Sequence, residues 1–214
     1  ITDTCPADRV EIRVGSNDLG KRSGELVAEL GRTGRVRFHY AHRENARKYP
    51  VMREMFHDPA HPIETDWLVW FDDDTMCDKN RDWLALLSGQ IVQYPDVDMF
   101  GPHRFYELKE KQPDWVRAAP WYKGRPFRDK GGKPVPNGNK VHFVVGAWFC
   151  LRTAAMRAAD IPCRRLAHNG GDWTIGEQLY QAGFKLKNWT GEKKIVEWSA
   201  VPRRGLSEPH PGTA

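Results

Sequence analysis

The chain has 214 residues, of which 40% are hydrophobic and 29% are charged, as in an ordinary globular protein. This length is enough for one well-buried domain, and no apolar run approaches the roughly 20 residues that an α-helix needs to span a bilayer. The net charge of +5 permits an anionic substrate or polymer as a partner but does not select one.

The four cysteines lie far apart and form no CxxC pair. Zinc sites and dense disulfide frameworks need characteristic cysteine spacings, so we expect neither. No basic segment followed by an apolar one opens the sequence as a secretory signal would. We therefore expect reduced cysteines and a cytoplasmic location.

Strand and helix patterns alternate over the first half of the sequence. Strands are predicted over 9–18, 35–42 and 66–74, and helices over 20–34, over 44–58 with an interruption near Pro50, and over 81–95. The near-continuous apolar run of the third strand is typical of a strand buried on both faces. Strands that alternate with helices predict an α/β domain with a mainly parallel central sheet flanked by helices. Ligands of such sheets gather at the carboxyl ends of the strands.

The second half begins with a long irregular segment, residues 101–141, which is rich in proline, glycine, basic and aromatic residues. A loop of this length is usually functional or disordered, and its aromatic residues argue against plain disorder. After it we predict a strand over 141–152, helices over 153–160 and 172–184, and coil over 201–214. Ile175, Leu179 and Tyr180 should lie on one face of the last helix.

Three consecutive aspartates, Asp72, Asp73 and Asp74, end the third strand. Adjacent like charges are costly unless a positive group lies among them, so the pattern predicts a cation site at the tip of this strand. Because side chains alternate along a strand, Asp73 should point away from the other two. An acidic turn that caps the next segment is the alternative.

The stretch LVWFDDDTM, followed later by NGGDWTIGEQLYQAGFKL, resembles nucleotide-sugar glycosyltransferases of the GT-A fold, and most of all the inverting family 2. VEIRVGSND, HRENARKYPVMREMF and VVGAW resemble further family motifs, in the expected order. The resemblance implies that residues 1–214 form one Rossmann-like GT-A domain. Nothing before Cys5 corresponds to the family's usual first strand, which implies an incomplete or divergent N-terminus. Gly171 stands where the family's acidic pair has its glutamate, and this leaves Asp172 alone.

The resemblance implies a metal-dependent, inverting transfer of a sugar from a nucleotide-diphosphate sugar, with a UDP-sugar favoured, to an acceptor hydroxyl. Asp74 would contact Mn²⁺ or Mg²⁺ directly, because these ions prefer hard oxygen ligands. Asp72 would lie nearer the ribose or a metal-bound water. His210 would be a third metal ligand or a diphosphate contact, with an exposed side chain in a proline-rich tail as the alternative. Asp172 would be the general base, although it could instead cap its helix. Glu177 would face solvent or line the pocket, with the role of base as its alternative.

Several other residues are expected to bind the donor by the same resemblance, and a polar turn or a solvated basic surface is the alternative for most of them. They are Ser16, Asn17 and Asp18 at the end of the first predicted strand, Arg47 and Lys48 in the second predicted helix, Asp73 in the aspartate run, Gly146 and Trp148 on the VVGAW strand, and Arg203 and Arg204 near the C-terminus. Arginine forks match phosphate oxygens. A glycine at position 146 permits close approach to the backbone.

The segment 101–141 is expected to be an insertion loop on the acceptor side. Trp115, Trp121 and Tyr122 could stack on sugar rings or bases while neighbouring basic residues meet phosphates, or the same residues could anchor the loop to its own domain. The acceptor would be a glycan, a polymer or a modified nucleic acid. Two alternatives for the whole protein stay open: a retaining glycosyltransferase or nucleotidyltransferase on the same fold, and a nucleic-acid-binding module without transferase activity.

Overall fold

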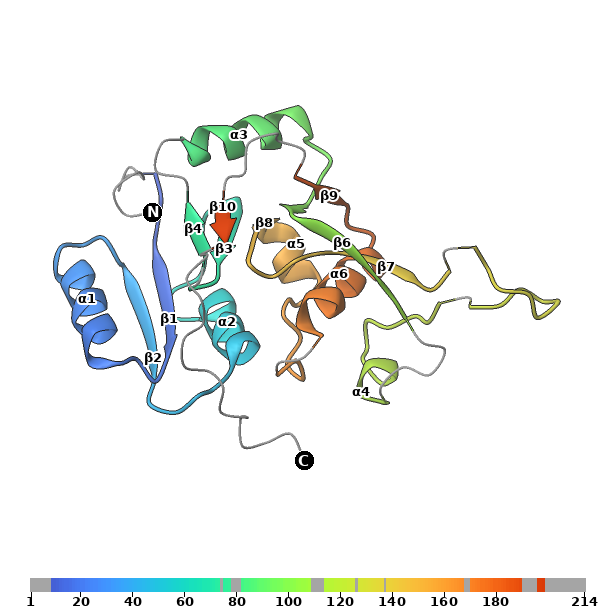
Figure 1. Ribbon diagram of the computed structural model, residues 1–214, viewed down its shortest axis with the longest axis horizontal. Coiled ribbons are helices and arrows are strands. Elements are labelled where there is room, and N and C mark those ends of the chain that lie inside the picture. The colour runs from blue at the N-terminus through green and yellow to red at the C-terminus, as the bar shows by residue number, and fades with distance from the viewer. Residues whose placement is uncertain are drawn as a thin grey trace.

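The computed structural model describes residues 9–73, 75–77, 82–108, 114–125, 127–136, 138–167, 170–189 and 196–198. Its strands are β1 (Arg13–Asn17), β2 (Phe38–His42), β3 (Trp67–Phe71), β4 (Thr75–Cys77), β5 (Met99–Gly101), β6 (His103–Glu107), β7 (Lys140–Val144), β8 (Trp148–Arg152), β9 (Leu186–Asn188) and β10 (Val196–Trp198). Its helices are α1 (Lys21–Arg32), α2 (Lys48–His57), α3 (Trp83–Gln93), α4 (Asp114–Arg117), α5 (Thr153–Ala158) and α6 (Gly171–Gln181). The fold is mixed α/β, as predicted (Figure 1).

The described strands form several small sheets rather than one mainly parallel sheet. The four-stranded sheet has the order β3-β8-β5-β9, in which β8 runs antiparallel to both β3 and β5 and only β5 and β9 are parallel. Separately, β1 and β2 form a parallel pair, while β6 with β7 and β4 with β10 form antiparallel pairs. The prediction of a mainly parallel central sheet is therefore wrong for these strands, because β8 enters between β3 and β5 in the opposite direction.

The parallel pair β1–β2 is connected through α1, as the alternation of strand and helix patterns predicted. Helix α1 lies on the outer side of this pair, and α2 lies between the pair and the centre of the molecule (Figure 1). Helix α2 begins at Lys48, so Pro50 lies in its first turn. Proline is tolerated there because the first N–H groups of a helix have no intrahelical partner. The predicted helix over 44–58 is thus shorter, and Pro50 does not interrupt it.

The predicted strand over 141–152 is two strands, β7 and β8, separated by residues 145–147. β7 pairs with β6, whereas β8 pairs with β3 and β5. The backbone N–H of Val145 donates to Pro102 O at 2.8 Å, and this contact holds the connection beside the start of β6. The break leaves Gly146 in a turn between two sheets rather than inside a strand.

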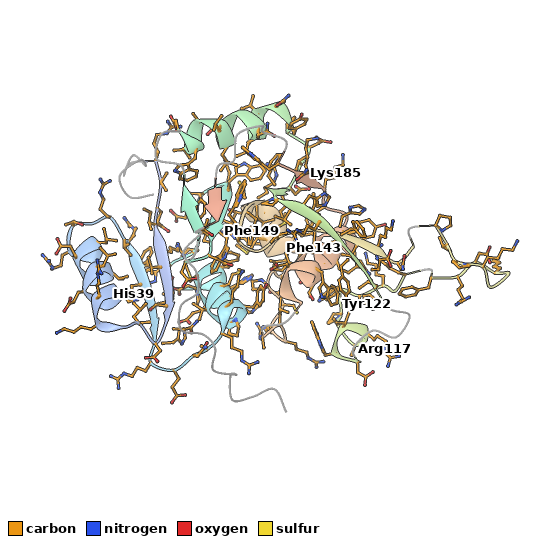
Figure 2. The ribbon with its side chains drawn as sticks, in the orientation of Figure 1. His39, Arg117, Tyr122, Phe143, Phe149 and Lys185 are labelled. Carbon is orange, nitrogen blue, oxygen red and sulfur yellow. The ribbon has the colours of Figure 1, made fainter. Side chains whose placement is uncertain are left out.

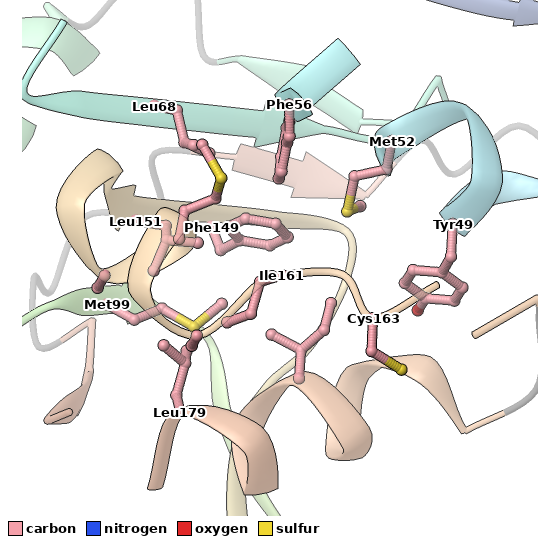
Figure 3. Close-up of a cluster of buried hydrophobic side chains, with 14 of the residues drawn as sticks. Tyr49, Met52, Phe56, Leu68, Met99, Phe149, Leu151, Ile161, Cys163 and Leu179 are labelled. Carbon is pink, nitrogen blue, oxygen red and sulfur yellow. The ribbon is translucent and has the colours of Figure 1, made fainter. Parts of the chain in front are cut away.

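The core lies on both faces of β8. Phe149 and Leu151 point into a cluster with α2, α5 and α6 that includes Met52, Phe56 and Leu179 (Figure 3). Trp148 and Cys150 point into a second cluster with Trp83 and Leu87 of α3. β8 is therefore buried on both faces, as was predicted for β3. β3 lies at the end of the strand order, and within it only Leu68 is buried.

Helix α6 buries the predicted apolar face only in part. Ile175 and Leu179 are 2% and 0% exposed, but Tyr180 is 59% exposed. The guanidinium of Arg125 lies 4.3 Å from the centroid of the Tyr180 ring.

Cys150 and Cys163 are buried free thiols, as expected. Among the described helices, none is long and apolar enough to cross a membrane.

Candidate active site

Two aspartates that are far apart in the sequence, Asp72 and Asp172, are linked through Lys48 and Gly146. The Lys48 ammonium donates to Asp72 Oδ2 and to the carbonyl oxygen of Gly146, at 2.8 Å in each case. The backbone N–H of Gly146 donates to Asp172 Oδ2 at 2.8 Å. The sequence analysis proposed these four residues from four separate motifs, and the structure brings them together.

Three of these residues lie at the ends of elements, and Gly146 lies in the turn between β7 and β8. Asp72 directly follows β3, and its own N–H donates to Ala147 O at 2.8 Å, which ties it to the turn before β8. Lys48 begins α2, and Asp172 is in the first turn of α6. The Asp172 carboxylate does not cap this helix, because its described hydrogen bonds come from other segments of the chain. Helix capping is therefore not the role of this side chain.

Lys48 supplies the positive group that the aspartate run requires. Its side chain is 22% exposed and that of Asp72 is 25% exposed, so the ion pair is largely withdrawn from water. Burial raises the pKa of Asp72 above its ordinary value, and the charge of Lys48 acts against this rise. The second carboxylate oxygen of Asp72 accepts the indole N–H of Trp70 at 2.6 Å. Asp72 is thus held in one orientation by a cation and a neutral donor.

Tyr49 is part of this site, although the sequence analysis did not select it. Its hydroxyl donates to Asp172 Oδ1 at 2.5 Å, and the residue is 5% exposed. Burial, together with the nearby Asp172 carboxylate, raises the pKa of Tyr49, so the phenol keeps its proton and remains a donor. The unusual glycine at position 171 was the available signal, because a Cβ at Gly171 would overlap the Tyr49 ring. The ring occupies the space that a side chain at position 171 would need.

Gly146 is required by the crowding of its two charged neighbours. A Cβ at this position would lie 2.6 Å from the Lys48 ammonium nitrogen and would overlap Asp172 Oδ1. Any larger residue would therefore displace the Lys48 ammonium or the Asp172 carboxylate. Gly146 thus lets these two side chains lie close to the backbone, and the close approach of a donor sugar at this position stays a prediction.

The predicted donor-binding residues Ser16 and Asn17 at the end of β1 form their described hydrogen bonds with neighbouring segments and not with Asp72 or Asp172. The buried Ser16 pairs through Oγ with His39 Nε2 at 2.8 Å. Asn17 Oδ1 accepts the N–H of Ala46 at 2.9 Å and so fixes the segment that leads into Lys48.

Asp18, Arg47 and Asp73 are exposed. Within the described part of the chain, none of them forms a hydrogen bond or ion pair with Asp72 or Asp172. Asp18 and Arg47 have φ angles of 46° and 67°, a backbone region that non-glycine residues rarely adopt.

Trp148 and Glu177 lie in the interior rather than at the site surface. Trp148 is 4% exposed and packs edge-on against Trp189 in the second core cluster. Glu177 is fully buried, and its Oε2 accepts Arg125 Nη2 at 2.6 Å. The expectation that Glu177 faces solvent or lines the pocket is wrong, because Arg125 reaches it from the loop. This pair, with the Lys123 ammonium on Gln181 O at 3.0 Å, anchors the loop to α6.

The remaining predicted site residues, Asp74, Arg203, Arg204 and His210, lie outside the described residues. In the ranges that are described, no group of three or more histidine, cysteine, aspartate or glutamate side chains is placed to hold a metal ion. No family model matches this chain, and no curated protein sequence matches it.

Proposed function

We propose that this chain is a metal-dependent, inverting glycosyltransferase of the GT-A type, which transfers a sugar from a nucleotide-diphosphate sugar to an acceptor hydroxyl. The supporting observation is that Asp72 and Asp172 share the Lys48–Gly146 unit as hydrogen-bond partners. Such a transferase needs positive charge at the leaving diphosphate and a base on the acceptor side of the same sugar. Lys48 would supply the positive charge and Asp172 the base. Gly146 joins these two residues, because its carbonyl oxygen accepts from Lys48 and its N–H donates to Asp172.

Asp172 would act as the general base. As the acceptor oxygen forms its bond to the anomeric carbon, its proton passes to the Asp172 carboxylate. The bond from the anomeric carbon to the diphosphate oxygen breaks on the opposite face, and the diphosphate leaves with the electron pair. Each carboxylate oxygen has two lone pairs, so Asp172 can accept this proton while Tyr49 and Gly146 hold its orientation.

Lys48 and Asp72 would act on the leaving-group side. The Lys48 ammonium lies 5.5 Å from the ring centroid of Tyr49 and 5.9 Å from that of Trp70, so it is confined by aromatic walls. A cation whose position is fixed in this way offsets the negative charge of the leaving diphosphate, and the protein does not have to rearrange during the reaction. A UDP-sugar remains the favoured donor.

The donor atoms at Asp72 fit Mn²⁺ or Mg²⁺. Its carboxylate is a hard oxygen donor, and its oxygens each accept one hydrogen bond and keep a lone pair. We expect Asp74 to be the second carboxylate. When bound, the ion would neutralise the charge of the departing diphosphate as a Lewis acid.

A thermal-shift titration with nucleoside diphosphates and nucleotide sugars, with and without Mn²⁺, tests this proposal. A ligand that binds only the folded protein raises the Tm, so we expect a Mn²⁺-dependent rise with one donor class. Asp72→Asn and Asp74→Asn should abolish that rise. Asp172→Asn should keep it but lose sugar transfer in a coupled diphosphate-release assay.

The matched control is Asp66→Asn, which alters an exposed aspartate at the opposite end of β3. This variant should behave like the wild type in both assays. Full transfer by Asp172→Asn would contradict an inverting mechanism with this base. A Tm that no donor raises would contradict the transferase proposal as a whole.

A further inference from the structure

Two aromatic rings stack on each other directly beside Asp172. Trp173 follows Asp172 in the first turn of α6, and the centroid of its ring lies 5.5 Å from that of Tyr106 in β6, at an interplanar angle of 11°. The indole nitrogen of Trp173 is packed against the backbone of Gly170, because a Cβ at Gly170 would overlap it. We call Trp173 and Tyr106 the aromatic pair.

Part of the aromatic pair is open to solvent. Tyr106 is 40% exposed, and Trp173 is only partly buried. Carbon atoms of stacked rings lie about 3.5–4 Å apart. Two nearly parallel rings whose centroids are 5.5 Å apart are therefore displaced sideways by about 4 Å. This displacement leaves part of each ring uncovered by the other.

The β6–β7 hairpin presents Tyr106 on the face that packs against α6. Side chains alternate along a strand, so Tyr106 shares its face with Arg104, which is opposite Phe143 of β7. Phe143 contacts α6, because a Cβ at Gly176 would lie 2.6 Å from Phe143 Cβ. Phe143 lies toward the opposite side of the molecule from His39 of β2 (Figure 2). The aromatic pair is therefore on the side of the candidate active site away from β1 and β2.

The aromatic residues that were expected to stack on an acceptor are placed differently. Trp115 and Trp121 pack against the core cluster that contains Phe149, and Trp121 is edge-on to Tyr122. These contacts fit the alternative, in which the three residues anchor the loop to its own domain. Tyr106 lies in the same segment, 101–141, and its ring is exposed beside the candidate active site.

The charges around the aromatic pair favour a neutral ligand over a polyanion. Among the described residues on this face of the hairpin, Arg104 is the only charged one. The Asp172 carboxylate, next to Trp173, repels phosphate groups. A groove that follows a nucleic-acid backbone has a run of positive charge in addition to its stacking rings. The aromatic pair has the rings without that run of charge.

We propose that the aromatic pair binds a sugar ring of the acceptor, and that the acceptor is a neutral glycan chain. This inference rests on the proposed transferase function, in which the acceptor hydroxyl reaches Asp172. A chain that extends from this hydroxyl away from β1 and β2 passes the aromatic pair. The C–H face of a pyranose is flat and apolar, so it packs on an aromatic ring while its hydroxyl groups stay in water at the edge.

Four neutral tetrasaccharides test this inference in the absence of any donor. They are cellotetraose, tetra-N-acetylchitotetraose, maltotetraose and β-1,4-mannotetraose, which differ in linkage and substituents but all have pyranose rings. Saturation-transfer NMR and tryptophan fluorescence titration with the whole chain measure their binding. We expect at least one of them to bind with a dissociation constant of about 1 mM or lower. An oligonucleotide of eight thymidines is the polyanionic competitor and should bind more weakly.

Variants of β6 test whether the sugar binds at the aromatic pair. Tyr106→Ala should weaken the tetrasaccharide at least about fivefold, as the removal of one stacking ring does for nucleic-acid bases. Tyr106→Phe keeps the ring and should bind like the wild type. The matched control is Phe105→Ala, which removes a neighbouring ring that is 58% exposed. Phe105 lies on the other face of the hairpin, where the Lys140 ammonium is 5.1 Å from its ring centroid, so this variant should keep wild-type affinity.

Three results would overturn the inference. The first is no saturable binding of any of the four tetrasaccharides up to about 10 mM. The second is equal affinity of Tyr106→Ala and Phe105→Ala for the sugar. The third is tighter binding of the thymidine oligonucleotide than of every tetrasaccharide. A Mn²⁺-dependent rise in Tm with a donor, found together with any of these, would leave the transferase proposal standing. Sugar binding that depends on Tyr106, without such a rise, would contradict the transferase proposal alone.

Discussion

Replacing Tyr49 with phenylalanine tests whether the Tyr49 hydroxyl holds Asp172 in place. The substitution removes one oxygen atom, which lies 2.5 Å from Asp172 Oδ1, and keeps the ring that packs beside Gly171. No cavity larger than that oxygen is created. Any effect therefore reports the lost hydrogen bond rather than lost packing.

The expected effect can be calculated from the type of bond. A hydrogen bond to a charged group contributes about 1.5–3 kcal/mol to stability, and Tyr49 is buried, so water cannot readily replace the donor. For a chain of this length, 1 kcal/mol corresponds to about 2–4 °C in Tm. We therefore expect the Tm of Tyr49→Phe to fall by about 3–12 °C. If Asp172 is the base, sugar transfer should also slow while the affinity for the donor stays the same.

Urea denaturation and differential scanning calorimetry measure the change in stability. Tyr40→Phe is the matched control, because the Tyr40 hydroxyl also donates to a carboxylate, Asp58 Oδ2, at 2.8 Å. Tyr40 is more exposed, so water can take over its role and the loss should be smaller. A Tyr49→Phe protein with wild-type Tm would refute the proposed role of this hydroxyl.

Three further substitutions have definite expected outcomes. Arg125→Met leaves the buried Glu177 carboxylate without its cation, so the free energy of unfolding in urea should fall by about 3–5 kcal/mol. Gly171→Ala places a Cβ against the Tyr49 ring, so calorimetry should show a lower Tm. Asp58→Asn should lower the Tm at neutral pH, and the difference from the wild type should shrink as the pH falls below about 4.

The last of these predictions depends on the sign of the pKa shift. Hydrogen bonds from His61 and then from Tyr40 hold the pKa of Asp58 below its ordinary value. A carboxyl group whose pKa is lowered by folding contributes stability above its unfolded pKa and loses it as the pH falls through the folded pKa. A constant difference in Tm from neutral to acid pH would contradict this assignment.

The other two predictions have their own controls. The double variant Arg125→Met/Glu177→Met should recover most of the lost stability, because an apolar pair of similar volume no longer buries an isolated charge. If the double variant were no more stable than Arg125→Met, loss of packing would be the cause. For position 171, Gly170 is unsuitable as a control because its φ is 75°, whereas Gly89→Ala alters an exposed glycine inside α3 with nothing within 4 Å. Equal losses at positions 89 and 171 would contradict the clash with Tyr49.

The main part of the candidate site could be predicted from the motifs that contain its residues. Asp72 follows an apolar strand, Lys48 begins a helix, and Asp172 lies in the first turn of another. The resemblance of the surrounding motifs selected these residues, whereas periodicity had placed Lys48 inside a helix over 44–58 and not at its start. Neither shows which side chains meet, and so Tyr49 and Trp70 were missed, because aromatic residues in apolar patterns are typical of a core.

Features that depend on tertiary contacts could not be predicted. Glu177 is polar and lies on a helix, a pattern typical of a solvated face, and its burial is made tolerable by Arg125 from a distant loop together with the Gln181 amide. The apolar residues before and after Gly146 gave no sign that β7 and β8 join different sheets. The prediction of a mainly parallel sheet failed because β8, which begins after this break, runs antiparallel to both β3 and β5.

A crystal structure of the protein soaked with Mn²⁺ and UDP tests the proposed chemistry most directly, because manganese gives an anomalous signal. We expect an anomalous peak within coordination distance of the Asp72 carboxylate, about 2.0–2.3 Å, with the diphosphate beside Lys48. An anomalous map without a peak at Asp72, in crystals where UDP is bound elsewhere, would contradict the proposal that this aspartate run binds a metal ion for a departing diphosphate.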